Sequence, residues 1–207
     1  MLSFVDHLVY ATPDLDAGIA SIEGLLGCTV VAGGKHEGWG TRNALVSLGD
    51  ATYLEIIGPD PEASINGPAT LFGIDALREP RLVTWAMKGH DLDELVTTAA
   101  GDGVDLGSVA SGSRSLPDGS VLTWQLTDPF ADRAGGILPF FIDWGDGPHP
   151  AASLPSAGEL VALTLSHPDA CTGAVLETLG IPMSVTASQT ARISATIRTP
   201  HATITLS

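Results

Sequence analysis

The feature that most constrains how this chain can fold is a pattern of secondary structure that occurs twice. The run SFVDHLVYAT alternates and is rich in β-formers, Asp14 then opens a helical spacing of apolar residues, and three more strand candidates follow before residue 60. The run RLVTWAMK repeats the strand, and Asp91 again precedes Leu-Asp at a helix start, 77 residues after Asp14 (91 − 14 = 77). Both copies therefore predict the order β-α-β-β-β.

A third, shorter copy is visible towards the end of the chain. A strand ELVALTLS, a helical segment and three runs rich in Thr, Ile and Val follow one another from residue 159. We therefore predict an α+β fold of tandem βαβββ modules, in which two modules form a half-open cleft of curved sheets. The predicted division is a first module at 1–60, a linker at 61–79, a second module at 80–150 and the third at 155–207.

Composition excludes several classes of function. The 207-residue chain carries a net charge of −15 with only nine Lys and Arg, which argues against nucleic acid and anionic membranes as partners. Two cysteines argue against a disulfide framework, and no run of about 18 apolar residues is present. The beginning MLSFVDHLVY lacks the basic-then-apolar layout of a secretory signal, so we expect a cytoplasmic protein.

One carboxylate stands out in the first copy. Glu55 interrupts the apolar strand YLEIIG, although an unpaired charge is costly to bury. Alternation places it on one face with Tyr53 and Ile57. We predict that this face borders a polar cavity, although an edge strand with the same face in water would also accommodate a carboxylate.

The first strand carries a second candidate. His7 shares a face with Val5 and Val9 if the strand alternates regularly. The alternative to a functional role is a purely structural one, in which His7 is a half-buried histidine hydrogen-bonded to a backbone carbonyl.

These residues carry a resemblance to a known family. The motifs are DHLVYATPDLDAGI, GGKHEGWGTRNALVSLGDATYLEIIG and, in the second copy, SRSLPDGSVLTWQL followed by LPFFIDWG. In this combination the chain resembles the vicinal-oxygen-chelate superfamily, which includes glyoxalase I, extradiol dioxygenases and bleomycin-resistance proteins. Within that superfamily it is most similar to the branch called glyoxalase-like domain.

The resemblance implies a divalent metal held by one residue on the first strand and one on the last strand of each module. Carried over, these residues are His7 and Glu55 in the first module, a donor set that suits Mn, Fe, Ni or Zn. In the second module Thr84 matches His7 and is a poor ligand, while Asp143 is the candidate opposite Glu55, or Ile142 after a slip of one residue.

A further histidine would complete such a site. His36, on a glycine-rich bend, and His149, in the segment after the second module, are both candidates for this position.

A second group of residues is expected to bind the substrate. They are polar or aromatic residues on strands and bends that are candidates to line the cleft: His36, Thr41, Asn43, Arg114, Gln125 and Phe141. A surface ion pair is an equally open interpretation of Arg114, and a core position is the safer interpretation of Phe141.

The leading hypothesis is a metal-dependent lyase or isomerase for a small oxygenated metabolite, with the metal as Lewis acid and Glu55 or Asp143 as general base. The alternative is a metal-free protein that binds and sequesters an aromatic ligand. A metal-free enzyme with Glu55 or His7 as base lies between them. We also expect a homodimer, because an unpaired third module would expose a sheet face.

Overall fold

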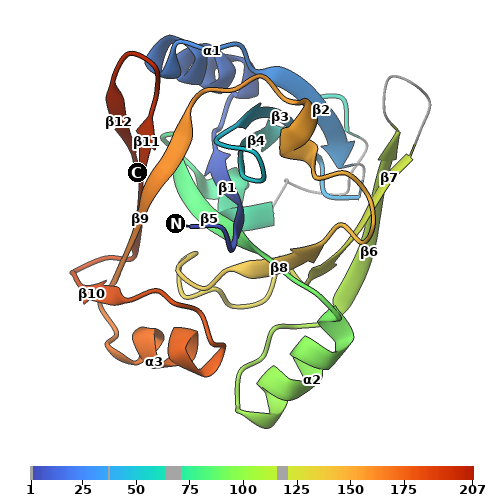
Figure 1. The fold of residues 1–207 in the computed structure, drawn as a ribbon, viewed down its shortest axis with the longest axis vertical. Coiled ribbons are helices and arrows are strands. Elements are labelled where there is room, and N and C mark those ends of the chain that lie inside the picture. Colours follow the sequence, from blue (N-terminus) through green and yellow to red (C-terminus); the bar gives the residue numbers. More distant parts are fainter. Residues whose placement is uncertain (1, 37, 64–70, 116–120) are drawn as a thin grey trace.

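The computed structural model describes residues 2–36, 38–63, 71–115 and 121–207, except for the side chains of residues 114 and 115. Three consecutive groups of elements follow the order β-α-β-β-β, with two short 3-10 helices between them (Figure 1). The first group is β1 (Val5–Ala11), α1 (Leu15–Leu26), β2 (Val31–His36), β3 (Thr41–Ser47) and β4 (Tyr53–Pro59), followed by η1 (Leu71–Ala76). The second is β5 (Arg81–Lys88), α2 (Leu92–Gly101), β6 (Val109–Ser115), β7 (Val121–Thr127) and β8 (Phe140–Asp143), followed by η2 (Pro150–Ser153). The third is β9 (Glu159–His167), α3 (Cys171–Thr178), β10 (Val185–Ala187), β11 (Arg192–Arg198) and β12 (Thr203–Leu206).

The first two groups form a single curved sheet of eight strands. Its order is β2-β3-β4-β1-β5-β8-β7-β6, so each half contributes four strands in the same relative order, and β1 and β5 meet as antiparallel neighbours at the centre. In each half the first strand runs parallel to the last, β1 to β4 and β5 to β8. The predicted α+β fold of tandem βαβββ modules is thus confirmed, while the residue boundaries of the three units stay predictions.

The helix starts show where the two halves differ locally. Asp14 has an extended backbone, and its side chain accepts a hydrogen bond from the N–H of Ala17, as an N-cap residue does. Gly27 ends the same helix with a φ of 66°, a left-handed conformation that glycine adopts without strain. Asp91 begins α2 with a φ of 47°, and its side chain makes no capping bond. The repeated Asp-Leu-Asp pattern therefore predicts the positions of both helices, but only the first aspartate, Asp14, caps its helix through its side chain.

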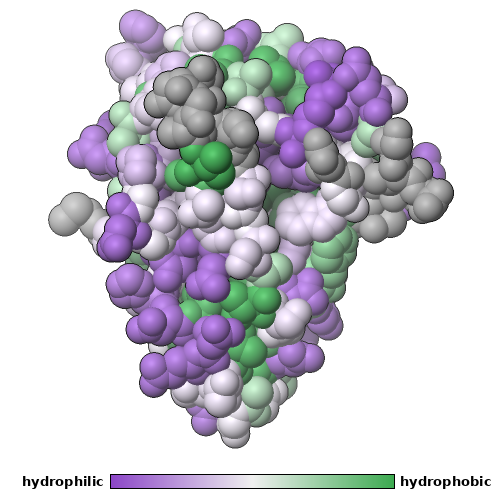
Figure 2. All heavy atoms as spheres, turned by 90° about the vertical axis from the view of Figure 1, so that its right-hand side faces the viewer, coloured by the Kyte–Doolittle hydropathy of each residue, from purple (hydrophilic) through white to green (hydrophobic). Residues whose placement is uncertain are grey.

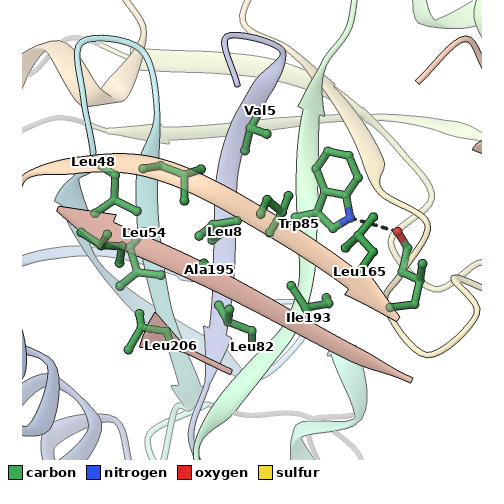
Figure 3. Close-up of a cluster of buried hydrophobic side chains, with 14 of the residues drawn as sticks. Val5, Leu8, Leu48, Leu54, Leu82, Trp85, Leu165, Ile193, Ala195 and Leu206 are labelled. Atoms are coloured by element: carbon green, nitrogen blue, oxygen red, sulfur yellow. Dashed lines mark hydrogen bonds between the residues drawn. The ribbon is translucent and has the colours of Figure 1, made fainter. Parts of the chain in front are cut away.

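The main hydrophobic core lies behind the eight-stranded sheet. Helix α1 packs its buried face, which includes Ile22 and Leu26, against outward-facing residues of β3 and β4 such as Leu54. Strands β9 and β11 cross behind β1 and β5, and Figure 3 shows Leu165 and Ile193 beside Trp85 in this core. The other face of the sheet is left to form a cavity.

The third group keeps the element order but pairs its strands differently. Its sheet order is β10-β9-β11-β12, with β10 parallel to β9, whereas the first half places its first strand beside its last. This sheet packs on the back of the larger one and is tied to the end of β3 by backbone bonds from Ala157 to Ser47 and from Leu160 to Leu48.

This packing removes the reason for which we expected a homodimer, since the inner face of the third sheet is covered within the same chain. On the face of the molecule that Figure 2 shows, hydrophobic side chains lie in separate patches between hydrophilic ones. The homodimer stays a prediction. No helix formed by the described residues is long and apolar enough to cross a membrane.

Candidate functional site

The inner face of the large sheet borders a cavity of about 720 Å³ between the two halves. Strands β1, β3 and β4 provide His7, Asn43 and Glu55 on one side, and β7 and β8 provide residues such as Trp124 and Phe140 on the other. Side chains alternate along β4, so that Tyr53, Glu55 and Ile57 line the cavity while Leu54 enters the core behind. The face predicted for Glu55 is therefore the cavity face.

His7 and Glu55 meet at the floor of this cavity. The Nε2 atom of His7 lies 3.8 Å from Oε2 of Glu55, and both residues are more than nine-tenths buried. The two strands are parallel neighbours, with His7 paired to Tyr53 and Val9 paired to Glu55, so the contact is diagonal. An imidazole and a carboxylate thus face each other in surroundings from which most water is excluded.

A residue that we did not predict, Asp6, holds the other side of the imidazole. Its fully buried carboxylate accepts hydrogen bonds from His7 Nδ1 at 2.8 Å, Trp144 Nε1 at 3.1 Å and His149 Nε2 at 3.1 Å. Burial by itself raises the pKa of Asp6, but the hydrogen bonds from His149 and His7 and their charges lower it overall, from the ordinary 3.8 to about 2.

This arrangement determines which nitrogen of His7 carries the proton. An ionised carboxylate can only accept, so Nδ1 of His7 donates to Asp6, and in the neutral ring Nε2 is left with its lone pair towards the cavity and Glu55. His149 accepts a bond from the N–H of Ala151 at its own Nδ1, which leaves its Nε2 as the donor to Asp6.

A β-bulge explains why Asp6 was missed and why the parity predicted for β1 was wrong at one position. Val5 pairs with Met87 and His7 with Ala86, so β1 has one more residue than β5 at this point. Val5 consequently packs in the core behind the sheet, although we expected it on the same face as His7. The sequence signal that could have identified Asp6 is an acidic residue next to a histidine in an otherwise apolar strand.

The polar residues of β2 and β3 extend the network from Glu55. Asn43 donates through Nδ2 to Glu55 Oε1 at 2.6 Å and lies 3.4 Å from His36 Nε2, and its Oδ1 accepts from the N–H of Gly34. His36 Nδ1 lies 2.9 Å from the hydroxyl of Thr41. Three predicted substrate-binding residues, His36, Thr41 and Asn43, are therefore brought together beside the first-module pair.

Aromatic side chains form much of the remaining wall. Tyr53 stacks on the His7 ring with centroids 4.5 Å apart, and Phe140 meets the same ring edge-on at 5.4 Å. Trp124 and Trp144, from the second half, pack against each other with centroids 5.5 Å apart. Aromatic side chains of this kind can stack against a flat ligand.

The structure places two other candidates outside the cavity. Asp143 accepts a bond from the N–H of Gly145 and lies 3.4 Å from His90 Nδ1 on the outer side, and it does not line the cavity. Gln125, paired with Asp143 across β7 and β8, is exposed on the face opposite Trp124.

Phe141 and Arg114 complete the set of predicted residues. Phe141 is buried in the core behind the sheet, and its neighbour Phe140 occupies the cavity wall instead. The backbone of Arg114 pairs with Leu122 in the β6–β7 hairpin, but its side chain lies outside the described part of the chain, so its role stays a prediction.

Strand register identifies the counterpart of His7 in the second half. Strands β1 and β5 are antiparallel neighbours, in which His7 pairs with Ala86 and Val9 pairs with Thr84. If the two strands are interchanged, Thr84 takes the position of His7 and Ala86 takes the position of Val9. This agrees with the offset of 77 residues, and it places a hydroxyl where the first half has an imidazole.

The same register identifies the counterpart of Glu55. Val9 pairs with Glu55 in the first half, and Ala86, which takes the place of Val9, pairs with Phe140. The residue opposite Glu55 is therefore Phe140, and neither Asp143 nor Ile142 holds that position. The second half presents a hydroxyl and an aromatic ring where a four-ligand metal site would need two donors.

Comparison with known proteins now identifies the family. The family model described as glyoxalase-like domain matches residues 5–179, which covers most of the chain. This chain is a member of the glyoxalase-like domain family. The comparison with curated proteins returned no significant match.

Solved structures resemble this glyoxalase-like domain in fold. A hypothetical protein from Staphylococcus aureus is 13% identical over 97% of each chain, with a TM-score of 0.69. A methylmalonyl-CoA epimerase from Mycobacterium tuberculosis is 23% identical over 72% of this chain and 91% of that chain, with a TM-score of 0.43. A variant of the Streptomyces coelicolor enzyme of that name, in complex with 2-nitronate-propionyl-CoA, is 21% identical over 70% and 97%, with a TM-score of 0.46. At these identities the similarity describes the fold alone.

The donor set of this glyoxalase-like domain can be tested against the divalent metal that the family resemblance implies. His7 Nε2 and Glu55 Oε2 are two suitable donors, and the counterpart positions hold Thr84 and Phe140. Among the described residues, no group of three His, Cys, Asp or Glu side chains is arranged to hold a metal ion. Protein metal centres commonly use three or four ligands, so these residues do not fit such a centre.

Proposed function

We propose that this glyoxalase-like domain is an enzyme of the lyase or isomerase type that moves protons on a small oxygenated metabolite bound in the cavity. The observation that supports the proposal is the row Asp6–His7–Glu55, in which a fully buried carboxylate orients an imidazole towards a second carboxylate at the cavity floor. Such an arrangement costs free energy to bury, and pairs of this kind are concentrated in active sites.

Each residue of the row has a separate task in the proposed reaction. Glu55, oriented by the hydrogen bond from Asn43, takes the proton from a carbon next to a carbonyl group and returns it to the neighbouring carbon. His7, whose Nε2 lone pair faces the cavity, takes the hydroxyl proton from one of two adjacent oxygens and returns it to the other. Asp6 keeps the ring in the required tautomer and stabilises the imidazolium while it exists.

Proton exchange with solvent tests this function without knowledge of the product. We expect the protein, incubated in D₂O with a panel of α-hydroxycarbonyl compounds, to incorporate deuterium at the carbon beside the carbonyl of at least one of them, as measured by NMR. Glu55→Gln should slow this exchange by about 100-fold or more. Glu159→Gln, at an exposed position in the third group, is the matched control and should leave the rate unchanged.

Added chelator distinguishes this mechanism from the metal-dependent one. Because the proposed steps use only side chains, the exchange rate should not change with chelator or with added Mn²⁺, Ni²⁺ or Zn²⁺. Exchange by Glu55→Gln at the wild-type rate, loss of exchange on chelation, or the absence of exchange for every compound would each contradict the proposal.

The aromatic wall favours a second candidate, a protein that binds a flat ligand without converting it. Tyr53, Phe140, Trp124 and Trp144 line the cavity from both halves, and Phe140 stands where a second acidic ligand would be. A thermal-shift screen with aromatic compounds tests this role. Stabilisation by such a compound, together with no deuterium exchange from any carbonyl substrate, would favour the binding protein over the enzyme.

A further inference from the structure

A second cleft, of about 1090 Å³, opens beside the cavity. Its walls are the segment that leads into β5, the loop between β7 and β8, and the beginning of β11. Phe72 and Pro129 line both spaces, so the cleft and the cavity are neighbours that share a wall. The two spaces are therefore close enough to be considered as parts of one ligand site.

The cleft concentrates positive charge in an acidic protein. Four of the nine basic residues of the chain line it, namely Arg78, Arg81, Arg133 and Arg192, against two acidic side chains, Glu79 and Asp132. Within the described residues none of the four arginines forms an ion pair. In a chain of net charge −15, where carboxylates outnumber cations, this lack of internal partners is unexpected.

Arg133 is the most unusual of the four, because it is only 7% exposed and forms no ion pair with any carboxylate that the structure describes. Its guanidinium donates to the backbone oxygens of Pro139 and Asp128 and to the hydroxyl of Thr127. Its Nε is buried and finds no hydrogen-bond partner in the described part of the chain. Burial lowers the pKa of Arg133 to about 10, although Asp128 and Asp105 act in the opposite direction. A charge in this position gains from a nearby anion.

Thr84 adds a second unpartnered group in the same wall. This residue is 1% exposed, lines the cleft, and its hydroxyl has no hydrogen-bond partner among the described residues. Buried polar groups are normally bonded, so two residues of one cleft that each carry an unsatisfied buried polar atom favour a site that a ligand completes.

Close backbone contacts hold the cleft in shape. Gly136 has a φ of 94°, and a Cβ atom there would lie 1.8 Å from the carbonyl oxygen of Val83 in β5. A Cβ on Gly135 would lie 2.7 Å from Ala191, next to the first residue of β11. The loop that carries Arg133 is thus wedged between β5 and β11, near the ends where Arg81 and Arg192 begin these strands.

We propose that this cleft binds the phosphate or diphosphate group of the ligand whose reacting part lies in the neighbouring cavity. Guanidinium groups bind the oxygens of such groups in pairs of parallel hydrogen bonds, and several arginines can share one highly charged group. The substrate class is then a phosphorylated α-hydroxycarbonyl compound. This last statement rests on the proposed function, whereas anion binding by the cleft does not.

Titration with inorganic pyrophosphate tests the anion site directly. We expect pyrophosphate at millimolar concentration to raise the thermal unfolding midpoint of the wild-type protein and to bind measurably by calorimetry, more weakly as salt is added. The double variant Arg81→Gln/Arg192→Gln should bind at least about 10-fold more weakly, because each lost guanidinium removes a charged donor. Both residues are exposed, so the variant should fold.

Arg198→Gln is the matched control, since it removes an exposed arginine at the other end of β11 and should bind pyrophosphate like wild type. Citrate in place of pyrophosphate shows whether a carboxylate ligand is preferred. Equal pyrophosphate affinity of the wild type and the double variant, no binding by either, or tighter binding of citrate would overturn the proposal.

The outcomes separate this proposal from the function of the cavity. Glu55→Gln should abolish deuterium exchange and keep its affinity for pyrophosphate. If exchange occurs, the double variant should raise the KM for phosphorylated substrates with little change in kcat, and should leave both constants unchanged for uncharged ones. Arginine-dependent binding of pyrophosphate without any deuterium exchange would refute the proposed enzyme and support the anion site. Deuterium exchange without arginine-dependent binding of pyrophosphate would refute the anion site and support the enzyme.

Discussion

Replacement of Asp6 by asparagine perturbs the centre of the candidate site at a single oxygen. One side-chain oxygen becomes an NH₂ group, which cannot accept a hydrogen bond, whereas in the wild type Oδ1 accepts from His7 and Oδ2 accepts from Trp144 and His149. If the NH₂ group faces His7, the ring meets another donor or moves its proton to Nε2, which removes the lone pair from the cavity side. If it faces Trp144 and His149, two N–H groups lose their acceptor. Both stability and proton transfer should suffer.

The magnitude of the stability loss follows from the pKa of Asp6. A fall of the pKa from 3.8 in the unfolded chain to about 2 in the folded protein corresponds to about 2.4 kcal/mol, at about 1.36 kcal/mol for each pH unit. Since the folded value is the lower one, this stabilisation is complete above pH 3.8 and is lost as the pH falls towards about 2. We expect the free energy of unfolding of Asp6→Asn to be at least about 2 kcal/mol lower than that of the wild type near neutral pH. Its thermal unfolding midpoint should be about 5 to 10 °C lower.

Urea denaturation of both proteins at a series of pH values provides the measurement. The difference between wild type and Asp6→Asn should shrink as the medium becomes more acidic, and Asp16→Asn, which removes an exposed carboxylate paired with Arg42, should cost about 0.5 kcal/mol or less. Nitrogen-15 NMR of His7 should show the proton on Nδ1 in the wild type only. A difference below about 0.5 kcal/mol that does not depend on pH would refute the reasoning.

Two further predictions concern the wall of the second cleft. Thr84→Val should raise the free energy of unfolding by about 1 kcal/mol when no anion is present, because a methyl group replaces a buried hydroxyl without a partner; a measured loss in urea denaturation would show that the hydroxyl is satisfied. Gly136→Ala should lower it by more than about 2 kcal/mol, since the added Cβ meets the Val83 carbonyl at 1.8 Å. Gly103→Ala, at a similar positive φ with open space around it, should cost only about 1 kcal/mol, and equal losses for both glycines would contradict the steric argument.

Much of the fold could be predicted because local patterns determine it. Alternating strands, an aspartate before each of the first two helices and a glycine after the first are local signals, and they place the elements of all three groups in the right order. Strand pairing in the third group could not be predicted, because the order β10-β9-β11-β12 depends on packing against the larger sheet. Sequence periodicity does not report which neighbour a strand will have.

The candidate site shows the same division between local and non-local information. Glu55 could be found because a carboxylate in an apolar alternating strand needs a polar group beside it, and His7 is one such group. Asp6 could not be placed, because a one-residue bulge in β1 changes the direction of the side chains before His7. Phe140 was missed for a related reason: only the pairing of β5 with β8 shows which residue lies opposite Glu55.

The position of the third sheet has a mechanical consequence. Because side chains of β9 and β11 fill the space behind both central strands, rotation of one half of the molecule against the other would expose Trp85 and its neighbours to water (Figure 3). Hinge opening at this line is therefore unfavourable, which disfavours any change in the distance between the two walls of the cavity. Adaptation to a bulkier molecule would have to come from substitutions in the lining side chains, while the frame around them stays rigid.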